Sequence, residues 1–524
     1  MLFNIILNKK ELSFITLIIL ILFYLIFNTG LHGDDYTVIS RWTLTNFFQL
    51  TPENLGLKIS GVPDYLLFWW IYPALGHDYQ WCYDLIKWSS HLTAILMAWR
   101  FFSLFINVYR SFAASLFFVL LPLHETTTYW YMTAPYIFWP AIIMFSFYLL
   151  TINKLKLGCM LGALGAFSGY LSPPYVFGLS LIFFLRREYH KGILFITPGF
   201  FYIIYYFYIK FAFPFTEARI NPNLDLELFC KGMVLQFFGI IDSVIGPSAF
   251  LKIYYSVLSI DIFSLFIAIV ILVLSWCQIF QIYNNKTTYS VPNGLRDLLF
   301  GAVSVLVLSL GMFALTGLYV PSPFNLGNRS LVYCSLAVSA LLASLKINRK
   351  NLLIIWFIFI LPVFGLSDHW KAWNYRQLQI LQNIKNHDGL RQLKKNDTLI
   401  VTGNIYNKLG PFSHIEFFSM PWVVTSIFRD FCDLENVVAI NQTTLFDENI
   451  LRDSKFGGIY PITGNIYIYD SEKNTLSSGS SNDIVGLIKH RPQEIRHWVQ
   501  LAKGTFIEKS ILTLSPRLQY LFVY

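Results

Sequence analysis

Residues 12–27 read LSFITLIILILFYLIF, an uncharged apolar run that follows Lys9 and Lys10. Similar blocks recur as far as Leu366, and each approaches the roughly 20 residues that a helix needs to cross about 30 Å of hydrocarbon. The 524-residue chain is 55% hydrophobic and 13% charged, whereas soluble domains are roughly 25% charged. The pattern excludes an ordinary soluble enzyme and predicts a polytopic membrane protein. No small-residue cleavage site follows the first run, so we interpret it as the first transmembrane helix and not as a secretory signal.

Basic residues between the apolar blocks predict the topology, because cytoplasmic loops are enriched in Lys and Arg. Lys9 and Lys10 place the N-terminus in the cytoplasm. Alternation of basic and non-basic loops gives about 11 spans, and an odd number of crossings places residues 367–524 outside. The basic clusters are short and separated, so the net charge of +9 does not indicate a nucleic-acid partner.

Three apolar segments depart from the pattern of simple spans. Residues 158–185 have basic residues at both ends and are split by Ser172-Pro173-Pro174, which predicts a hairpin of two short helices. Residues 65–75 and 228–245 are apolar but too short to cross, so we expect helices that lie along the outer surface of the bilayer.

Residues 367–524 read like a soluble domain. A polar helical stretch to about Leu393 is followed by strand-like runs at residues 398–402, 458–469 and 519–524. The region contains no glycine-rich phosphate loop, paired CxxC or HExxH motif. The predicted fold is therefore mainly α, with a transmembrane helix bundle at residues 1–366 and a small extracytoplasmic α/β domain at residues 367–524.

Asp34 and Asp35 follow the first span in the stretch HGDDY at residues 32–36. Two adjacent carboxylates at a membrane boundary repel one another and require hydration or partners. One of them suits a general base that takes a proton from an attacking hydroxyl, while its neighbour orients the acceptor or a metal. The alternative is that one of them caps a helix over residues 36–48.

A later outside loop contains His124 and Glu125, followed by threonines and the aromatic residues Tyr129, Trp130 and Tyr131. Aromatic faces stack on sugar rings and a histidine can pair with a phosphate, so the loop is a candidate sugar or phosphate site. The alternative is an aromatic belt at the membrane interface with a histidine at a helix end.

Two arginines lie on the predicted outer side of the membrane, where positive charge is less expected than in the cytoplasm. Arg329, in the loop PSPFNLGNR at residues 321–329, can clamp an anionic head group through two hydrogen bonds. Arg219 lies in the outside segment 214–256. The alternatives are snorkelling of Arg329 to lipid phosphates and pairing of Arg219 with Glu217.

These features resemble the GT-C superfamily of integral membrane glycosyltransferases, which use sugars linked to polyprenyl phosphate. The resemblance rests on the pair Asp34-Asp35 in the first external loop, an interfacial segment behind it, a short-helix hairpin, and a soluble domain after the last span. The chain looks most similar to bacterial transferases that decorate O-antigen or other surface glycans. Several relatives have Asp-Glu where this chain has Asp-Asp, so either carboxylate can be the base.

The resemblance implies inverting transfer of a sugar from a polyprenyl-phosphate donor to a glycan acceptor at the outer face of the cell membrane, as part of the cell envelope. Its catalytic residues would be Asp34, as the base, and Asp35, which would orient the acceptor or assist. The residues implied for the donor phosphate are Arg329, Arg219, His124 and Glu125, and those implied for the sugar are Tyr129, Trp130 and Tyr131. No metal is obligatory, although paired aspartates leave Mg²⁺ or Mn²⁺ open. Apolar grooves between helices would accommodate the polyprenyl tail, and the C-terminal domain would cover the site or select the acceptor.

Other functions remain as alternatives. A surface-glycan polymerase or ligase usually has its large external loop between late helices, whereas this chain has its large external region after the last span. A lipid-linked-sugar transporter would carry ionisable residues at mid-span, but here the polar residues gather on the outer side. A non-catalytic scaffold would not need the pair Asp34-Asp35.

Overall fold

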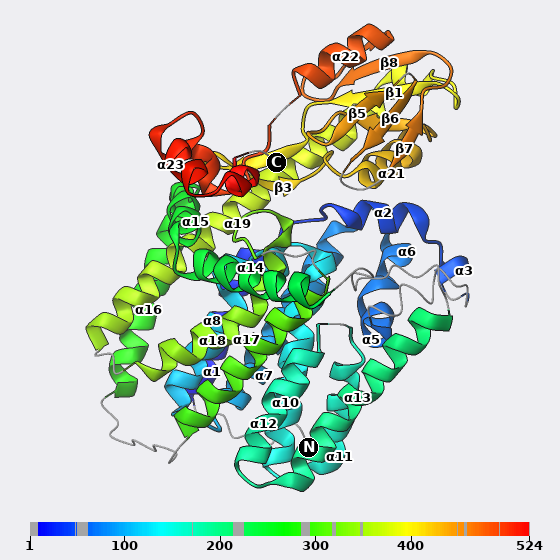
Figure 1. Ribbon diagram of the computed structural model, residues 1–524. Coiled ribbons are helices and arrows are strands. Elements are labelled where there is room, and N and C mark those ends of the chain that lie inside the picture. Colours follow the sequence, from blue (N-terminus) through cyan, green and yellow to red (C-terminus); the bar gives the residue numbers. More distant parts are fainter. Residues whose placement is uncertain are drawn as a thin grey trace.

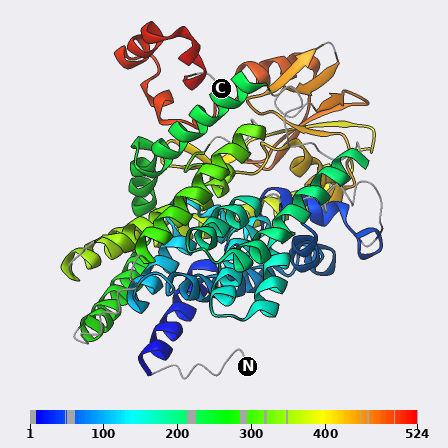
Figure 2. The ribbon, with the colours of Figure 1, turned by 60° about the horizontal axis from the view of Figure 1, so that its bottom comes forward.

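The computed structural model describes residues 9–47, 49, 61–169, 171–212, 225–283, 294–316, 321–345, 349–447, 449–454, 458–491 and 493–522. This part of the chain is mainly helical, with a β-containing region towards its C-terminal end. The helices form a bundle and the strands lie together beyond one end of it (Figure 1). In the turned view of Figure 2, α1 (Lys9–Ile26) and α23 (Phe506–Leu514) lie at opposite ends of the molecule.

Six helical stretches among the described residues are long and apolar enough to cross a membrane, on length and composition alone. They are Tyr131–Thr151, Tyr189–Ala212, Leu226–Leu258, Gly294–Thr316, Leu326–Ser344 and Ile354–Asn386. Shorter apolar helices of 10–17 residues accompany them: Ile15–Ile26, Arg110–His124, Leu155–Ala166, Pro173–Leu185 and Ile262–Leu274. The structure therefore supports a multi-pass membrane protein, and the total of about 11 spans stays a prediction.

The first half of the bundle contains long helices and, between them, runs of short helical elements. After α1 they are α2 (Asp34–Arg41), α3 (Leu44–Phe47), α5 (Val62–Asp64), the π-helical turn η1 (Tyr65–Trp69), α6 (Ile71–Leu75), α7 (Gln80–Phe102), α8 (Val108–Leu120), the 3₁₀ turn η2 (Pro122–His124), α9 (Thr126–Tyr129), the 3₁₀ turn η3 (Tyr131–Thr133) and α10 (Pro135–Thr151). The second half comprises α11 (Leu155–Ala166), α12 (Pro173–Leu185), α13 (Tyr189–Ala212), α14 (Leu226–Val244), α15 (Pro247–Leu258), α16 (Ile262–Tyr283), α17 (Gly294–Thr316), the 3₁₀ turn η4 (Leu326–Leu331) and α18 (Val332–Ser344).

The predicted hairpin of short helices is confirmed, because residues 158–185 form α11 and α12 with a break before Pro173. Pro173 and Pro174 occupy the first positions of α12, where a missing N–H is not needed by the helix. The expected short segment 65–75 corresponds to η1 and α6. Residues 228–245 correspond to α14, but the expectation that this segment is too short to cross is not confirmed, because α14 and α15 together form the stretch Leu226–Leu258, which is long and apolar enough to span a membrane. The helix α14 ends before Gly246 and runs across its neighbours in Figure 1.

The longest helix, α19 (Arg349–Asn386), has 38 residues and connects the bundle to the C-terminal domain. At 1.5 Å per residue it is about 57 Å long, well beyond the roughly 30 Å of a bilayer core. The predicted domain boundary at residue 366 falls inside this helix. The Ser367 hydroxyl donates a hydrogen bond to the Leu25 carbonyl at 2.8 Å, which fastens α19 to α1.

The C-terminal region is an α/β domain with a central sheet in the order β4-β1-β8-β9, in which β1 is parallel to both neighbours. Its strands are β1 (Thr398–Thr402), β4 (Val437–Ala439), β8 (Ile466–Asp470) and β9 (Thr475–Ser478). A hairpin of β2 (Tyr406–Leu409) and β3 (Phe412–Glu416) and a three-stranded sheet of β5 (Thr444–Asp447), β6 (Ile450–Asp453) and β7 (Ile459–Pro461) complete the strands. The helical elements are α20 (Asp388–Arg391), α21 (Pro421–Cys432), α22 (Ser481–Lys489), the 3₁₀ turn η5 (Trp498–Ala502), α23 and the 3₁₀ turn η6 (Pro516–Leu521).

The strand predictions have mixed outcomes. The strand at residues 398–402 is confirmed as β1, and residues 458–469 form two strands, β7 and β8, with a turn at Gly464 between them. The strand predicted at residues 519–524 is wrong, because residues 516–521 form η6, and residues 523 and 524 lie outside the described residues. Pro516 explains the difference, since its fixed φ angle suits the first position of a helical turn.

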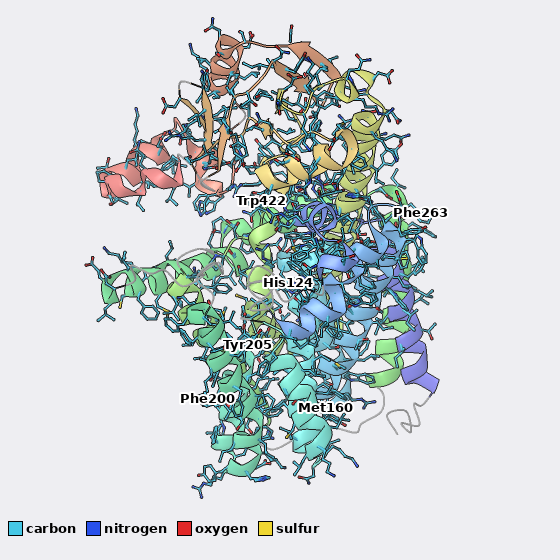
Figure 3. The ribbon with its side chains drawn as sticks, turned by 90° about the vertical axis from the view of Figure 1, so that its right-hand side faces the viewer. His124, Met160, Phe200, Tyr205, Phe263 and Trp422 are labelled. Carbon is cyan, nitrogen blue, oxygen red and sulfur yellow. The ribbon has the colours of Figure 1, made fainter. Side chains whose placement is uncertain are left out.

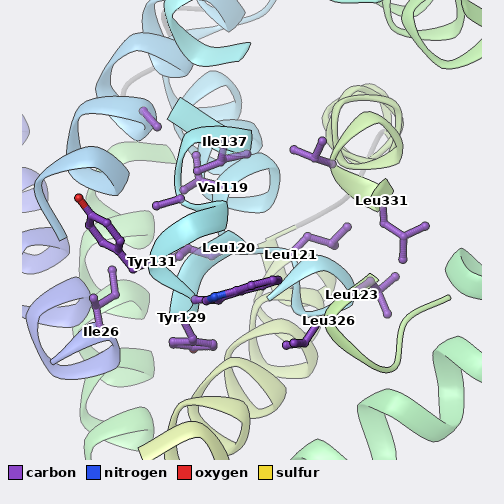
Figure 4. Packing of buried hydrophobic residues seen from close by; sticks show 14 of the residues in the cluster. Ile26, Val119, Leu120, Leu121, Leu123, Tyr129, Tyr131, Ile137, Leu326 and Leu331 are labelled. Carbon is purple, nitrogen blue, oxygen red and sulfur yellow. The ribbon is translucent and has the colours of Figure 1, made fainter. Parts of the chain in front are cut away.

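One buried apolar cluster extends from the bundle into the C-terminal domain, and it includes Leu22, Tyr131, Leu326, Phe412 and Val423. Figure 4 shows the part of this cluster around Tyr129, Tyr131 and Leu326. The two regions therefore share a core, and the candidate residues lie where they meet.

Candidate functional site

The turn before α2 brings three separate segments together. Gly33 has a φ angle of 50°, in the left-handed region where glycine is favoured. A Cβ atom at Gly33 would lie 3.2 Å from Met420 Cε and 3.3 Å from both Leu326 Cδ1 and Trp130 Cζ2. The loop after α8, the turn η4 and the segment before α21 thus converge on the residue that precedes Asp34.

Asp35 is fully buried in the first turn of α2. Its Oδ1 accepts a hydrogen bond from the Tyr72 hydroxyl at 2.5 Å, and its Oδ2 accepts one from the His32 backbone N–H at 2.8 Å. Burial raises the pKa of Asp35 to about 7, although these two hydrogen bonds and the charge of Lys87 oppose the shift. Asp35 therefore titrates near neutral pH.

The helix-capping alternative does not describe the pair. The helix begins at Asp34 and ends at Arg41, so the expected helix over residues 36–48 is not formed. Gly33 is the N-cap residue and provides no side-chain cap. Asp35 bonds to the amide of His32, which lies before the helix and is not one of the free amides of its first turn.

We expect Asp35→Asn to reduce the pH dependence of stability between pH 5 and pH 8. In the folded protein the pKa of Asp35 is about 7, against 3.8 for the unconstrained group, so the folded state binds this proton more tightly. The resulting stabilisation is present at low pH and is lost progressively as the pH rises from about 4 to about 7. The part lost above pH 5 spans about 2 pH units, or about 3 kcal/mol at about 1.4 kcal/mol per unit. Melting temperatures of the purified protein at the two pH values measure the effect.

The control is Glu435→Gln, which changes an exposed carboxylate. It should leave the difference in melting temperature between pH 5 and pH 8 as in the wild type. The melting temperature of Asp35→Asn could instead differ between pH 5 and pH 8 by as much as that of the wild type. This result would contradict a raised pKa of Asp35.

Asp34 is partly exposed and faces the C-terminal domain. The Trp422 indole N–H donates a hydrogen bond to Asp34 Oδ1 at 2.5 Å. Further along the same two helices, the Ser40 hydroxyl donates to Asp430 Oδ1 at 2.5 Å. His77, in the turn between α6 and α7, has its Nε2 3.0 Å from Asp430 Oδ2. Figure 3 shows Trp422 at the junction of the domain and the bundle. The helix α21 thus lies along α2 and contributes a side chain to the site.

Trp130 lies next to Gly33, and Arg329 lies over the Trp130 ring. The guanidinium carbon of Arg329 is 5.4 Å from the centre of the Trp130 ring and 5.7 Å from that of Tyr136, a favourable cation–π arrangement. Trp130 is only 2% exposed, and its indole N–H has no hydrogen-bond partner among the described residues. The structure therefore places Trp130 beside the turn that carries Asp34, and Arg329 beside Trp130.

His124, Tyr129 and Tyr131 are buried within the bundle. Both ring nitrogens of His124 lie within hydrogen-bond distance of protein oxygens, at 2.9 and 3.1 Å. The tyrosine hydroxyls donate to the backbone carbonyls of Val363 and Phe68, at 3.1 and 2.7 Å respectively. Figure 4 shows Tyr129 and Tyr131 among packed apolar side chains, and Figure 3 shows His124 below Trp422. These three residues pack the core in this structure and do not form an open sugar or phosphate surface.

Glu125 is the centre of a buried ionic cluster that joins four segments. Its Oε1 lies 2.7 Å from Lys252 Nζ on α15 and 3.0 Å from His414 Nε2 on β3, and its Oε2 accepts from Asn328 Nδ2 at 2.8 Å. Burial acts to raise the pKa of Glu125, but Lys252 and His414 outweigh it and lower the pKa to about 2. Burial also lowers the pKa of His414 to about 4, so at pH 7 this ring is neutral. Glu125 is thus a paired structural carboxylate next to the segment that carries Arg329.

The remaining predictions concern Arg219 and a metal. Arg219 lies outside the described residues. The two aspartates are held by different segments, Asp35 by α6 and Asp34 by α21. Within the described ranges, no three His, Cys, Asp or Glu side chains are grouped so that they could hold a metal ion.

Sequence reasoning missed several residues of this region. Trp422, Lys252, His414 and Asn328 were not among the candidates, and Tyr72 was noted only as part of an interfacial segment. Lys252 had a signal, because it is a lysine within the apolar helix α15 and such a charge requires a partner. No pattern in the sequence indicated that the partner is Glu125.

Comparison of the chain with protein-family models, with curated proteins and with solved structures gives no match. The resemblance to the GT-C superfamily therefore stays a prediction from the sequence, and the function has to be argued from the site itself.

Proposed function

We propose that this chain is a membrane glycosyltransferase that moves a sugar from a polyprenyl-phosphate donor to a hydroxyl group of a surface-glycan acceptor. The observation that carries the proposal is the position of Asp34, a partly exposed carboxylate at the turn where Trp130 and Arg329 also meet. Transfer away from a phosphate leaving group requires a base for the acceptor and a cation for the phosphate. The site lies at the end of the bundle that carries the C-terminal domain, which we propose to be the outer face of the cell membrane.

Asp34 is the proposed base. Its carboxylate takes the proton of the acceptor hydroxyl as that oxygen attacks the anomeric carbon of the sugar. The bond from the anomeric carbon to the phosphate oxygen breaks, the electron pair leaves with polyprenyl monophosphate, and the new glycosidic bond has the inverted configuration. Both oxygens of Asp35 already accept hydrogen bonds, so Asp35 supports the geometry of the turn.

Arg329 is the proposed partner of the leaving phosphate. The phosphate gains negative charge as the bond breaks, and a guanidinium can bind it through two charge-assisted hydrogen bonds. Because a monophosphate can be neutralised in this way, we propose that no metal is obligatory. Of the three predicted sugar-platform residues, Trp130 keeps that role, since its unpaired indole N–H is suited to a sugar or phosphate oxygen.

An apolar hollow between α11 and α13 supports the choice of a lipid-linked donor. Its volume is about 650 Å³, and its lining includes Phe167, Phe201, Tyr205 and Tyr208. Tyr205 and the nearby Phe200 and Met160 can be located on this side of the bundle in Figure 3. The hollow has the chemistry needed for part of an isoprenoid chain, because its surface is almost entirely apolar.

We expect Arg329→Met to lower kcat/KM for the donor roughly 10- to 100-fold, since a hydrogen bond to a charged group contributes about 1.5–3 kcal/mol. The measurement is steady-state transfer at varied donor concentration. Arg452→Met, which removes an arginine that is half exposed on β6, is the matched control and should leave kcat/KM unchanged. A kcat/KM for the donor that is the same in Arg329→Met and the wild type would remove Arg329 from the proposed phosphate site.

The proposal itself is tested with the wild-type protein. Purified protein is incubated with a panel of synthetic polyprenyl-phosphate sugars and a crude surface-glycan acceptor, with and without EDTA. We expect transfer from at least one donor at a rate that EDTA does not change. No transfer from any donor would contradict the proposal and would favour the polymerase or transporter alternatives.

A further inference from the structure

Lys87 is a fully buried lysine on α7, and it lies between the two loops that form the site. Its ammonium pairs with Asp84 Oδ1 at 2.8 Å and donates to Thr29 Oγ1 at 2.7 Å and to the Gly30 carbonyl at 3.0 Å. It also donates to the backbone carbonyl of Tyr129 at 2.8 Å. A single charged group therefore binds both the turn that leads to Asp34 and the loop that carries Trp130.

Asp84 completes the attachment of the first loop. Its Oδ2 accepts a hydrogen bond from the Asn28 backbone N–H at 2.8 Å, and its Oδ1 accepts one from the Gly30 N–H at 3.2 Å. Gly30 has a φ of +67°, and a Cβ atom there would lie 2.1 Å from the side-chain oxygen of Asn374 on α19. The turn is thus enclosed between the ion pair of α7 and the side chains of α19, and its path is tightly defined.

We infer that Lys87 is a positioning residue that fixes the separation between the Asp34-Asp35 turn and the Trp130–Arg329 side of the site. The inference rests on the proposed function, in which the base on one side must meet a sugar held on the other. Displacement of a base by even about 1 Å lowers a rate strongly, because the reacting atoms must be aligned before the bond forms. A buried ion pair contributes little net stability compared with apolar packing, so geometry is the better explanation of its presence here.

The charge of Lys87 also acts on Asp35. The charged and titratable groups around Asp35 among the described residues are Lys87, Asp34, His32, Tyr36, Tyr72, Tyr83 and Tyr131. Among them Lys87 lowers the pKa of Asp35, whereas burial, the dominant influence, raises it. Removal of Lys87 should therefore raise the pKa of Asp35 further, which gives a readout that a purely structural role would not change.

The test uses the double variant Lys87→Met/Asp84→Asn, because the single change at Lys87 would leave a buried carboxylate unpaired. The matched control is Lys191→Met/Glu188→Gln, another lysine–carboxylate pair three residues apart, with a distance of 2.8 Å, on a different part of the bundle. We expect kcat of the Lys87 double variant to fall at least 10-fold and the donor KM to change less than 3-fold. The difference in melting temperature between pH 5 and pH 8 should increase, because a higher pKa of Asp35 extends the range over which stability is lost. The control should match the wild type in all three.

Hydrogen exchange followed by mass spectrometry provides a readout that does not depend on transfer. We expect faster exchange in both residues 28–35 and residues 126–133 of the Lys87 double variant, and no change in the control. Exchange at the wild-type rate in either segment would overturn the inference. A wild-type kcat together with a wild-type pH dependence of the melting temperature would also overturn it. Absence of transfer by the wild-type protein would overturn the proposed function alone, and the exchange result would still decide the role of Lys87.

Discussion

Glu125→Gln is expected to lower the free energy of unfolding by about 3–5 kcal/mol, the range found when one partner of a buried ion pair is removed. The carboxylate accepts from Lys252, His414 and Asn328, and the charged side chains of the pair are at most 2% exposed. Glutamine preserves the shape but leaves the Lys252 ammonium buried without a counter-charge. Thermal unfolding of the purified variant measures the loss.

The double variant Glu125→Gln/Lys252→Met separates the charge effect from packing. It removes the unpaired ammonium and keeps side chains of similar length, so we expect it to recover most of the lost stability. An equal loss of stability in the single and double variants would show that the unpaired ammonium of Lys252 is not the cause of that loss. A single variant as stable as the wild type would contradict the ionic cluster itself.

Asp34→Asn is expected to lower the rate of sugar transfer by about 10²- to 10⁴-fold, the usual contribution of a general base. Asparagine can still accept the hydrogen bond from Trp422 Nε1, which lies 2.5 Å from Asp34 Oδ1, so the contact with α21 is retained while the base is lost. The measurement is initial-rate transfer by a variant whose melting temperature matches that of the wild type.

Asp430→Asn is the matched control for this substitution. Asp430 lies in the same contact between α2 and α21 and accepts from Ser40 at 2.5 Å, but it has no role in the proposed chemistry. The rate of sugar transfer by Asp430→Asn should stay within about 3-fold of the wild-type rate, because the loss of one surface hydrogen bond has a small energetic effect. An Asp34→Asn variant that keeps more than a tenth of the wild-type rate would exclude Asp34 as the base.

Most of the helices could be predicted from the sequence, because a segment in a bilayer must satisfy its backbone hydrogen bonds within itself. Residues 12–27 correspond closely to α1, and the Ser172-Pro173-Pro174 break separates α11 from α12. The central strand β1 was also predictable, since its apolar run is short and bounded by polar residues. The strand-like residues at 519–524 gave the wrong prediction because Pro516 starts a helical turn.

The site could be predicted only in part. The pair Asp34-Asp35 and the arginine at position 329 stood out because charges at a membrane boundary need partners. Trp422 is 388 residues away from Asp34, and no local pattern shows that two such distant segments meet. The loop at residues 124–131 indicated a polar site, but the fold buries His124 and pairs Glu125 with a lysine from α15. Sequence patterns thus identified unusual residues, whereas their partners followed from the fold.

The most direct test of the proposed function analyses the products of the wild-type reaction. Protein reconstituted in lipid vesicles is given an active polyprenyl-phosphate sugar and an acceptor, and both the released lipid and the new glycosidic bond are measured. We predict one polyprenyl monophosphate released for each bond formed, and a bond of inverted configuration by NMR. Retention of configuration, or movement of the donor across the bilayer with no bond formed, would contradict the proposal.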